Sequence, residues 1–191
     1  MHALAALMLL HGARLDGRVD AIGGMLLLPH QSRERWDRDM IALGFHHLDL
    51  ACGNDELTSY HLQAGIAAEH AIAKRYGDTN WGRILGYYES LMLIDHSPVA
   101  RLGHAVAVAQ ARGPDAGLRL LVPMLPSLPA RFPFGQIAQG DWLQELGRIA
   151  EAHSYYVLAL KNARSEGEAA FISAKLSVCG PLHLVGEGHT S

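Results

Sequence analysis

Apolar residues recur at helical spacing along most of the chain, and turn-forming residues divide it into segments. Residues 2–13 are rich in Ala, Leu and Met, which are strong helix formers. Residues 33–52 keep the same rhythm, for example at Trp36 and Met40, and Ser32 before them is the expected N-cap. Further helices are expected over residues 59–76, 81–95, 98–112, 114–125, 134–146, 148–163 and 165–177. The pattern therefore predicts an all-α protein.

The stretch "SPVARLGHAVAVAQARGPDAGLRLL", residues 97–121, has two interpretations. The alternation in "AVAVA" is compatible with a strand that feeds a phosphate-binding loop, whereas the wider apolar spacing is that of a helix face. Ser97 is a good N-cap, Pro98 suits the first helical position, and Gly113 with Pro114 stops the segment. These terminators favour a helix of about four turns over a strand.

Two regions are expected to depart from the helical pattern. An Asp-Gly and a Gly-Gly pair punctuate short apolar pieces, which predicts a loop excursion with a small β-hairpin near residues 16–28. The tail, residues 179–191, is expected to be flexible. The helical part, residues 1–178, is then expected to form a single domain, since a chain of 191 residues suits one core.

Residues 140–159 resemble the second half of a tetratricopeptide repeat. The small and bulky residues of that repeat are matched by Gly140, Leu143, Gly147, Ala152, Tyr156 and Ala159. Small residues let the two helices of a hairpin approach, and the aromatic residue packs between hairpins. Gly113 and Gly147 are both expected in helix–helix turns, and they lie one repeat period of 34 residues apart. We therefore expect stacked antiparallel helical hairpins of the tetratricopeptide-like kind.

Composition restricts the class of function. The chain has 49% hydrophobic and 18% charged residues and a formal net charge of −3, which describes a globular protein without a basic surface for nucleic acid. The two cysteines, Cys52 and Cys179, lie far apart and are expected as reduced thiols in a cytoplasmic protein. The apolar start is too short for a membrane span and lacks the basic residues of a signal peptide. Direct binding to nucleic acid or to a membrane is not expected.

The familiar catalytic and metal-binding patterns are missing from the sequence. The chain has 12 histidines, but none forms the His-Glu-x-x-His pattern of a zinc helix. A Gly-x-Ser-x-Gly elbow, a P-loop and a Gly-x-Gly-x-x-Gly loop are also absent. We therefore expect no enzyme, no catalytic residues, no metal and no cofactor, and we interpret the histidines as surface or hydrogen-bonded core residues.

Several polar and aromatic residues occupy positions where burial is costly. They are Gln31, Arg33, Trp36, Asp37, Tyr60, Gln63, His70 and Trp81. One interpretation is a structural network that ties the loop at 16–31 onto the helices. The other is a groove for a partner protein, because aromatic and Arg side chains are enriched at interface hot spots.

Several motifs resemble the C-terminal tetratricopeptide-like extension of extracytoplasmic-function (sigma-24-like) RNA polymerase sigma factors. The motifs are "ALMLLHGAR", "LLLPHQSRERWDRDMI", "YHLQAGIAAEHA" and "DTNW", followed by the Ser-Pro stretch described above. The resemblance covers about residues 3–177. It implies a role in transcription initiation in a bacterial cytoplasm, where the extension modulates sigma activity through protein contacts. The positions carried over are the eight polar and aromatic residues named in the preceding paragraph.

The chain also departs from that family at specific positions. The family's Asp-Gln-Asp-Arg has lost two carboxylates here, at His30 and Ser32, and its Asn-Arg in the fifth helix is Gly103-His104. Removing Arg and Asp from paired positions would dissolve a buried ion network. The sequence begins inside the extension, so the DNA-binding sigma regions are not expected in it.

These observations lead to one main hypothesis and two alternatives. The main hypothesis is a non-catalytic regulatory domain whose partner is a protein, such as sigma-factor domains or RNA polymerase. The first alternative is a stand-alone tetratricopeptide-like scaffold that binds an unrelated protein or peptide. The second alternative is a small-molecule or metal sensor that uses the histidine-rich helices.

Overall fold

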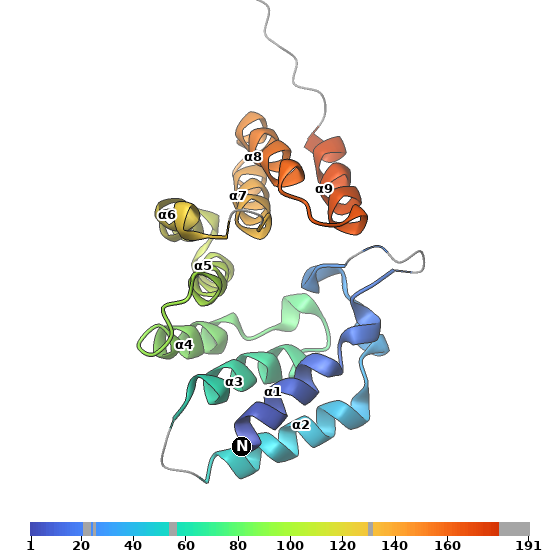
Figure 1. Ribbon diagram of the computed structural model, residues 1–191, viewed down its shortest axis with the longest axis vertical. Coiled ribbons are helices and arrows are strands. Elements are labelled where there is room, and N and C mark those ends of the chain that lie inside the picture. The colour runs from blue at the N-terminus through green and yellow to red at the C-terminus, as the bar shows by residue number, and fades with distance from the viewer. Residues whose placement is uncertain (21–23, 25, 54–56, 130–131, 180–191) are drawn as a thin grey trace, which may run out of the picture.

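The computed structural model describes residues 1–20, 24, 26–53, 57–129 and 132–179, and this part of the chain contains nine α-helices and no strand. Consecutive helices pack as antiparallel pairs and build a curved stack (Figure 1). The helices are α1 (His2–Gly12), α2 (Arg38–Ala51), α3 (Ser59–Ile72), α4 (Trp81–Leu91), α5 (Pro98–Arg112), α6 (Pro114–Met124), α7 (Phe134–Glu145), α8 (Ile149–Lys161) and α9 (Glu166–Cys179). Short 3-10 turns lie between them at η1 (Leu15–Gly17), η2 (Leu28–His30), η3 (Arg33–Arg35), η4 (Tyr76–Asp78) and η5 (Leu125–Ser127). The prediction of an all-α fold built from antiparallel helical pairs is confirmed.

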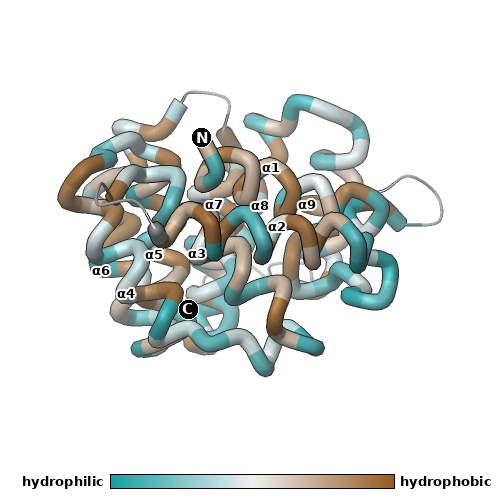
Figure 2. The backbone as a smooth tube through the Cα atoms, turned by 90° about the horizontal axis from the view of Figure 1, so that it is seen from below, coloured by the Kyte–Doolittle hydropathy of each residue, from teal (hydrophilic) through white to brown (hydrophobic). Residues whose placement is uncertain are grey.

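The buried apolar residues form three clusters that follow one another along the stack. The N-terminal cluster joins α1, α2 and α3 around Leu10, Trp36 and Ile41, and the middle cluster joins α3, α4 and α5 around Ile84 and Val108. Apolar and polar residues alternate along the whole course of the chain, and neither kind is confined to one end of the molecule (Figure 2). Burial is therefore shared between neighbouring helices, as expected for a stack.

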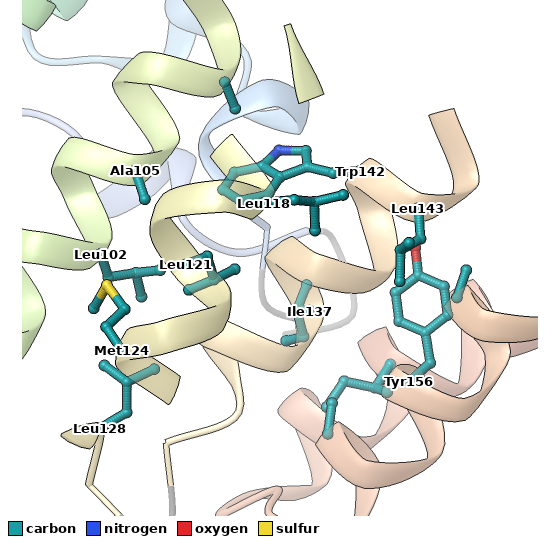
Figure 3. Close-up of a cluster of buried hydrophobic side chains, with 14 residues drawn as sticks. Leu102, Ala105, Leu118, Leu121, Met124, Leu128, Ile137, Trp142, Leu143 and Tyr156 are labelled. Carbon is teal, nitrogen blue, oxygen red and sulfur yellow. The ribbon is translucent and has the colours of Figure 1, made fainter. Parts of the chain in front are cut away.

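The C-terminal cluster connects α5 to α9 (Figure 3). Within it, Leu121, Leu143, Tyr156 and Ile172 are fully buried. Leu27, from the excursion between α1 and α2, also packs against this cluster. The N-terminal excursion thus reaches the C-terminal helices, and Figure 1 shows it beside α9.

The helical interpretation of "AVAVA" is confirmed, because α5 runs without interruption through it. The Ser97 hydroxyl caps the helix by accepting a hydrogen bond from the backbone N–H of Ala100 (3.3 Å), and Pro98 occupies the first turn. Gly113 follows α5 with φ +95°, and Gly147 follows α7 with φ +75°. A Cβ is disfavoured at such φ values, so both positions need glycine at the turn between paired helices.

The start of α2 differs from the prediction, because Ser32 precedes the turn η3 and does not cap α2. The cap is Asp37, whose carboxylate accepts a hydrogen bond from the backbone N–H of Met40 (2.9 Å). Between the two, Trp36 has an extended backbone (φ −81°, ψ 135°) and a buried side chain. The chain leaves helical geometry to place this ring in the N-terminal cluster, so tertiary packing outweighs the local helix propensity here.

Two other helices end earlier than predicted. The helix α3 stops at Ile72 rather than continuing to Tyr76, which lies in η4 with its ring against that of Trp81 (5.4 Å between centroids). The helix α4 stops at Leu91, and the Asp95 carboxylate beyond it accepts from the backbone N–H of Ser97 (2.8 Å). In both places a residue beyond the helix end forms a contact with the segment that follows.

The excursion before η2 contains the 3-10 turn η1, and Val19 after it forms an isolated β-bridge, so the described residues of the excursion contain no strand. The backbone N–H of Asp20 donates to the carbonyl of Gly24 (2.9 Å), and that of Leu26 donates to the carbonyl of Arg18 (2.8 Å). Part of the hairpin prediction falls on residues 21–23 and 25, which lie outside the described residues. The tail prediction also lies outside them, apart from Cys179, which ends α9.

Candidate functional site

Trp36 lies at the centre of the candidate site, between η3 and α2. Its ring is buried, and the backbone N–H of the next residue, Asp37, donates to the carbonyl of Ala13 at the end of α1 (2.9 Å). This bond holds the start of α2 against the end of α1. The indole Nε1–H is buried and has no acceptor. The ring is therefore fixed by packing and by the backbone on either side.

Two arginine side chains lie against the Trp36 ring. The guanidinium carbon of Arg33 is 4.2 Å from the ring centroid, and that of Arg14 is 5.1 Å from it. Both distances are within the range of a cation–π interaction, which is stronger where water is excluded. Burial, followed by the charges of Arg18 and Arg33, lowers the pKa of Arg14 to about 10. Arg14 and Arg33 thus bring two like charges together in a desolvated place.

Arg33 has no polar partner among the described residues. Its side chain is 7% exposed, and the Nε, Nη1 and Nη2 atoms are all buried without a hydrogen bond. Burial lowers its pKa, and the nearby Tyr76 acts in the opposite direction. An uncompensated buried charge is costly, because neither water nor a carboxylate replaces its hydration.

Gln31 connects Arg14 to the excursion. Its Oε1 atom accepts long hydrogen bonds from Arg14 Nη2 (3.3 Å) and Nε (3.4 Å), and its Nε2 atom donates to the carbonyl of Leu26 (2.9 Å). Arg35 Nη1 adds a bond to the carbonyl of Val19 (2.7 Å). These contacts tie the excursion to α1, as the structural-network interpretation requires. We call Arg14, Gln31, Arg33 and Trp36 the Trp36 cluster.

His70 and Trp81 form a second aromatic contact next to the Trp36 cluster. Their rings meet edge to face with centroids 5.3 Å apart, and the Tyr76 ring also meets that of Trp81 edge to face. Burial, followed by the charges of Arg14 and Arg33, lowers the pKa of His70 to about 3. The imidazole is therefore neutral near pH 7, and its Nδ1 atom is buried without a partner. Burial likewise raises the pKa of Tyr76 to about 12.

The remaining predicted residues lie away from this centre. Asp37 is the exposed N-cap of α2, which is a structural role. Tyr60 and Gln63 share one side of α3 with His70, but Tyr60 is 46% exposed and lies roughly 15 Å along the helix axis from His70. The set therefore separates into three groups: Gln31, Arg33, Trp36 and His70 are buried, Gln63 and Trp81 are half-buried, and Asp37 and Tyr60 are exposed.

Sequence reasoning missed two contributors, Arg14 and Tyr76. Arg14 follows an apolar helix directly, and Tyr76 lies in a polar segment that was interpreted as the end of α3. An arginine at the end of an apolar helix was the available signal for Arg14. No signal placed it beside Arg33, because the two residues belong to different elements.

The repeat-packing residues come together in the C-terminal cluster. The Tyr156 ring of α8 packs directly against Gly140 of α7, where a Cβ would lie 2.6 Å from ring atom Cε1, and Ala152 and Ala159 are fully buried on the same helix. The Tyr156 hydroxyl donates to Asp141 Oδ1 (2.5 Å) and lies 3.1 Å from Gln144 Oε1. Burial and the hydrogen bond to Asp141 raise the pKa of Tyr156.

Lys175 of α9 completes that arrangement. Its Nζ atom is 2.7 Å from the same Asp141 oxygen, and it lies 5.8 Å from the centroid of the Tyr156 ring. We call Asp141, Tyr156 and Lys175 the Tyr156 network. Lys175 and Asp141 form an ion pair there, so the cation beside the ring has a charged partner.

Gly103 and His104, which depart from the sigma-factor pattern, face Tyr88 of α4. A Cβ at Gly103 would lie 2.8 Å from the Tyr88 ring atom Cε1, so glycine permits the ring to pack on α5. The His104 ring lies 6.5 Å from that of Tyr88, and its buried Nε2 atom has no hydrogen-bond partner. Burial lowers the pKa of His104. Gly103 and His104 thus pack between α4 and α5.

The described residues contain no group of three or more His, Cys, Asp or Glu side chains arranged to hold a metal ion. His2 and His47 form an exposed pair across α1 and α2, with their Nδ1 atoms 2.9 Å apart.

Among the described helices, none has the length and apolar character that a membrane span requires.

The fold and the two aromatic arrangements define an all-α protein of stacked antiparallel helical pairs. Residues 1–52 match a family of unknown function (DUF6596). Over 190 residues, all of this chain, the sequence is 36% identical to "Uncharacterized protein R00370" of Rhizobium meliloti (strain 1021). The chain spans only 44% of the length of that relative. No solved structure matches the present chain significantly.

Proposed function

We propose that this chain is a non-catalytic protein-interaction domain, related to the helical extension of sigma factors, that modulates transcription initiation in the bacterial cytoplasm. The observation that carries the proposal is the combination of ordered sequence motifs with a stack of antiparallel helical pairs. Stacks of this kind present extended surfaces to protein partners. The chain aligns throughout with less than half of a longer relative, which fits a domain that works beside another domain.

The start of α3 offers a candidate contact surface. Leu57 and Tyr60 are large apolar side chains, three residues apart, and both are exposed. Exposed aromatic residues are enriched among the side chains that dominate protein–protein binding energy. Tyr60 is therefore the predicted partner-binding residue whose substitution disturbs the fold least.

The direct test measures binding of the full chain to bacterial core RNA polymerase and to isolated sigma-factor domains. We expect saturable binding to one of them, and a loss of about tenfold or more in affinity for Tyr60→Ala, which is the size of a moderate hot spot. The matched control is Leu158→Ala on α8, because Leu158 is 45% exposed and Tyr60 is 46% exposed. The control should bind as the unmodified chain does.

Two results would redirect the proposal. Absence of binding to both polymerase and sigma domains contradicts the transcription role. Specific binding to a protein unrelated to transcription, lost in Tyr60→Ala, would support the scaffold alternative. Stoichiometric metal in the purified protein would favour the sensor alternative, for which the pair of His2 and His47 is the first site to substitute.

A further inference from the structure

The Trp36 cluster combines positive charge, burial and free hydrogen-bond donors in one place. Arg33 has three buried nitrogen atoms without a partner, and the indole Nε1–H of Trp36 is also unpartnered. The Arg33 guanidinium lies 4.2 Å from the centroid of that same indole ring. Donors from two side chains are therefore close together. Buried polar groups in folded proteins are almost always hydrogen-bonded, so such a set needs an explanation.

The surrounding groups do not neutralise this charge. Arg14 adds a second guanidinium 5.1 Å from the ring centroid, and its hydrogen bonds are taken by the uncharged amide of Gln31. His70 is uncharged near pH 7, and its Nδ1 atom is a further unpartnered buried atom. Among the described residues, aspartates and glutamates form ion pairs with other arginines and with Lys175. None of these ion pairs includes Arg14 or Arg33.

We propose that the Trp36 cluster is an anion-binding site that takes the carboxylate of a small organic acid. A planar carboxylate accepts two parallel N–H bonds from one guanidinium, which is the geometry that an unpartnered Arg33 offers. Its single negative charge matches the one guanidinium that lacks any hydrogen bond. A phosphate dianion would lose more hydration on entering a buried place, because the cost of burying an ion rises with its charge. This inference concerns a small ligand and does not depend on a protein partner.

The thermodynamic consequence is a stabilisation that depends on ligand concentration. A ligand that binds the folded chain and not the unfolded chain raises the unfolding temperature by mass action. Because the site is buried, this effect must exceed the general effect of salt at the same ionic strength. The extra stabilisation by a carboxylate, compared with other salts, should depend on Arg33.

The test compares thermal unfolding of the full chain in sodium acetate, sodium propionate, sodium phosphate and sodium chloride at one ionic strength and pH 7.5. We expect the midpoint to rise by about 2–4 °C in a carboxylate over chloride, which corresponds to modest saturation for a chain of this size. The variant Arg33→Gln should lose this difference. The control variant Arg38→Gln removes the same charge from an exposed residue of α2 and should keep it.

A second measurement covers the case in which Arg33→Gln does not fold. Arg33→Lys retains the charge but not the planar fork, and we expect it to lose most of the carboxylate effect. Tryptophan fluorescence should change on titration with propionate in the unmodified chain and not in Trp36→Phe. Equal responses to acetate and chloride, or an undiminished response in the Arg33 variants, would overturn the site. A larger rise in phosphate than in carboxylate would overturn the ligand class.

Discussion

The Trp36 cluster and the Tyr156 network are both buried aromatic rings in contact with basic side chains, but they treat charge in opposite ways. Lys175 pairs with Asp141 at 2.7 Å, and the Tyr156 hydroxyl bonds to the same carboxylate. The two arginines beside Trp36 have no carboxylate partner. The polar groups of the Tyr156 network are paired, so we expect them to stabilise the C-terminal hairpins, whereas the unpaired groups of the Trp36 cluster are expected to reduce stability.

The largest expected effect comes from removing the ring of the Tyr156 network. Tyr156→Ala empties a fully buried position between α7 and α8, and we expect a loss of about 3–5 kcal/mol in the free energy of unfolding. Urea denaturation measures it. Tyr155→Ala is the control, since Tyr155 is only half-buried and should cost clearly less. Equal losses for the two variants would contradict the central place of Tyr156.

The second effect is a pH dependence that belongs to the N-terminal end. His70 has a folded pKa of about 3, below the ordinary value of 6.5, so the unfolded chain binds more protons between these pH values and stability falls as pH decreases through this range. The slope below pH 6.5 is about 1.4 kcal/mol per pH unit for one such group. His70 faces Arg14, Arg33 and His11, whose charges act in the same direction as burial.

Replacing His70 isolates this contribution from that of the carboxylates. Between pH 7.5 and pH 5.0, His70→Phe should lose about 2 kcal/mol less stability than the unmodified chain, as measured by urea denaturation at each pH. His46→Gln, an exposed histidine of α2, should follow the unmodified chain. Parallel curves for the unmodified chain and His70→Phe would show that His70 is not desolvated.

The third effect concerns the turns that make the C-terminal hairpins regular. Gly113 has φ +95°, so Gly113→Ala should cost about 1–2 kcal/mol of stability. Gly86, inside α4, has open space at its Cβ position, and Gly86→Ala should instead gain about 0.5–1 kcal/mol. Calorimetric unfolding of both variants checks the opposite signs. A gain for both would mean that the backbone at position 113 relaxes to an ordinary turn.

The smallest expected effect on stability has opposite signs in the Trp36 cluster and in the Tyr156 network. In chloride buffer without carboxylates, Arg33→Met removes an unpaired buried charge and should be neutral or stabilising by up to about 1 kcal/mol. Lys175→Met breaks a pair and leaves Asp141 without its cation, so it should cost about 1 kcal/mol. Urea denaturation of the two variants side by side gives the comparison. A substantial loss for Arg33→Met would show that its cation–π contact outweighs its desolvation.

Local sequence signals are sufficient to predict the helices and turns of the C-terminal hairpins, α5 to α8. Ser97 with Pro98 and the glycine at 113 fixed both ends of α5, because capping and positive φ depend on residues adjacent in sequence. The spacing of the two turn glycines likewise anticipated equivalent hairpins. The repeat pattern placed the aromatic residue between hairpins, whereas the Tyr156 ring packs on Gly140 within the α7–α8 hairpin.

The irregular half could not be predicted in the same way. Ser32 is a good capping residue by type, but burial of Trp36 moves the cap to Asp37. The meeting of Arg14 with Arg33 arises from the folding of η3 against the end of α1, and no periodic pattern encodes it. The candidate site was therefore predicted in its residue types but not in its charge balance.

Leu27 gives the stack a property that a simple array of hairpins lacks. In such an array each unit touches only its neighbours, so one end can melt while the other persists. Here a residue from the excursion after α1 packs against the cluster built by α5 to α9. That contact closes a long loop in the chain, which slows folding but couples the two ends. Amide hydrogens in α1 and α9 should consequently exchange in one concerted opening rather than fraying separately.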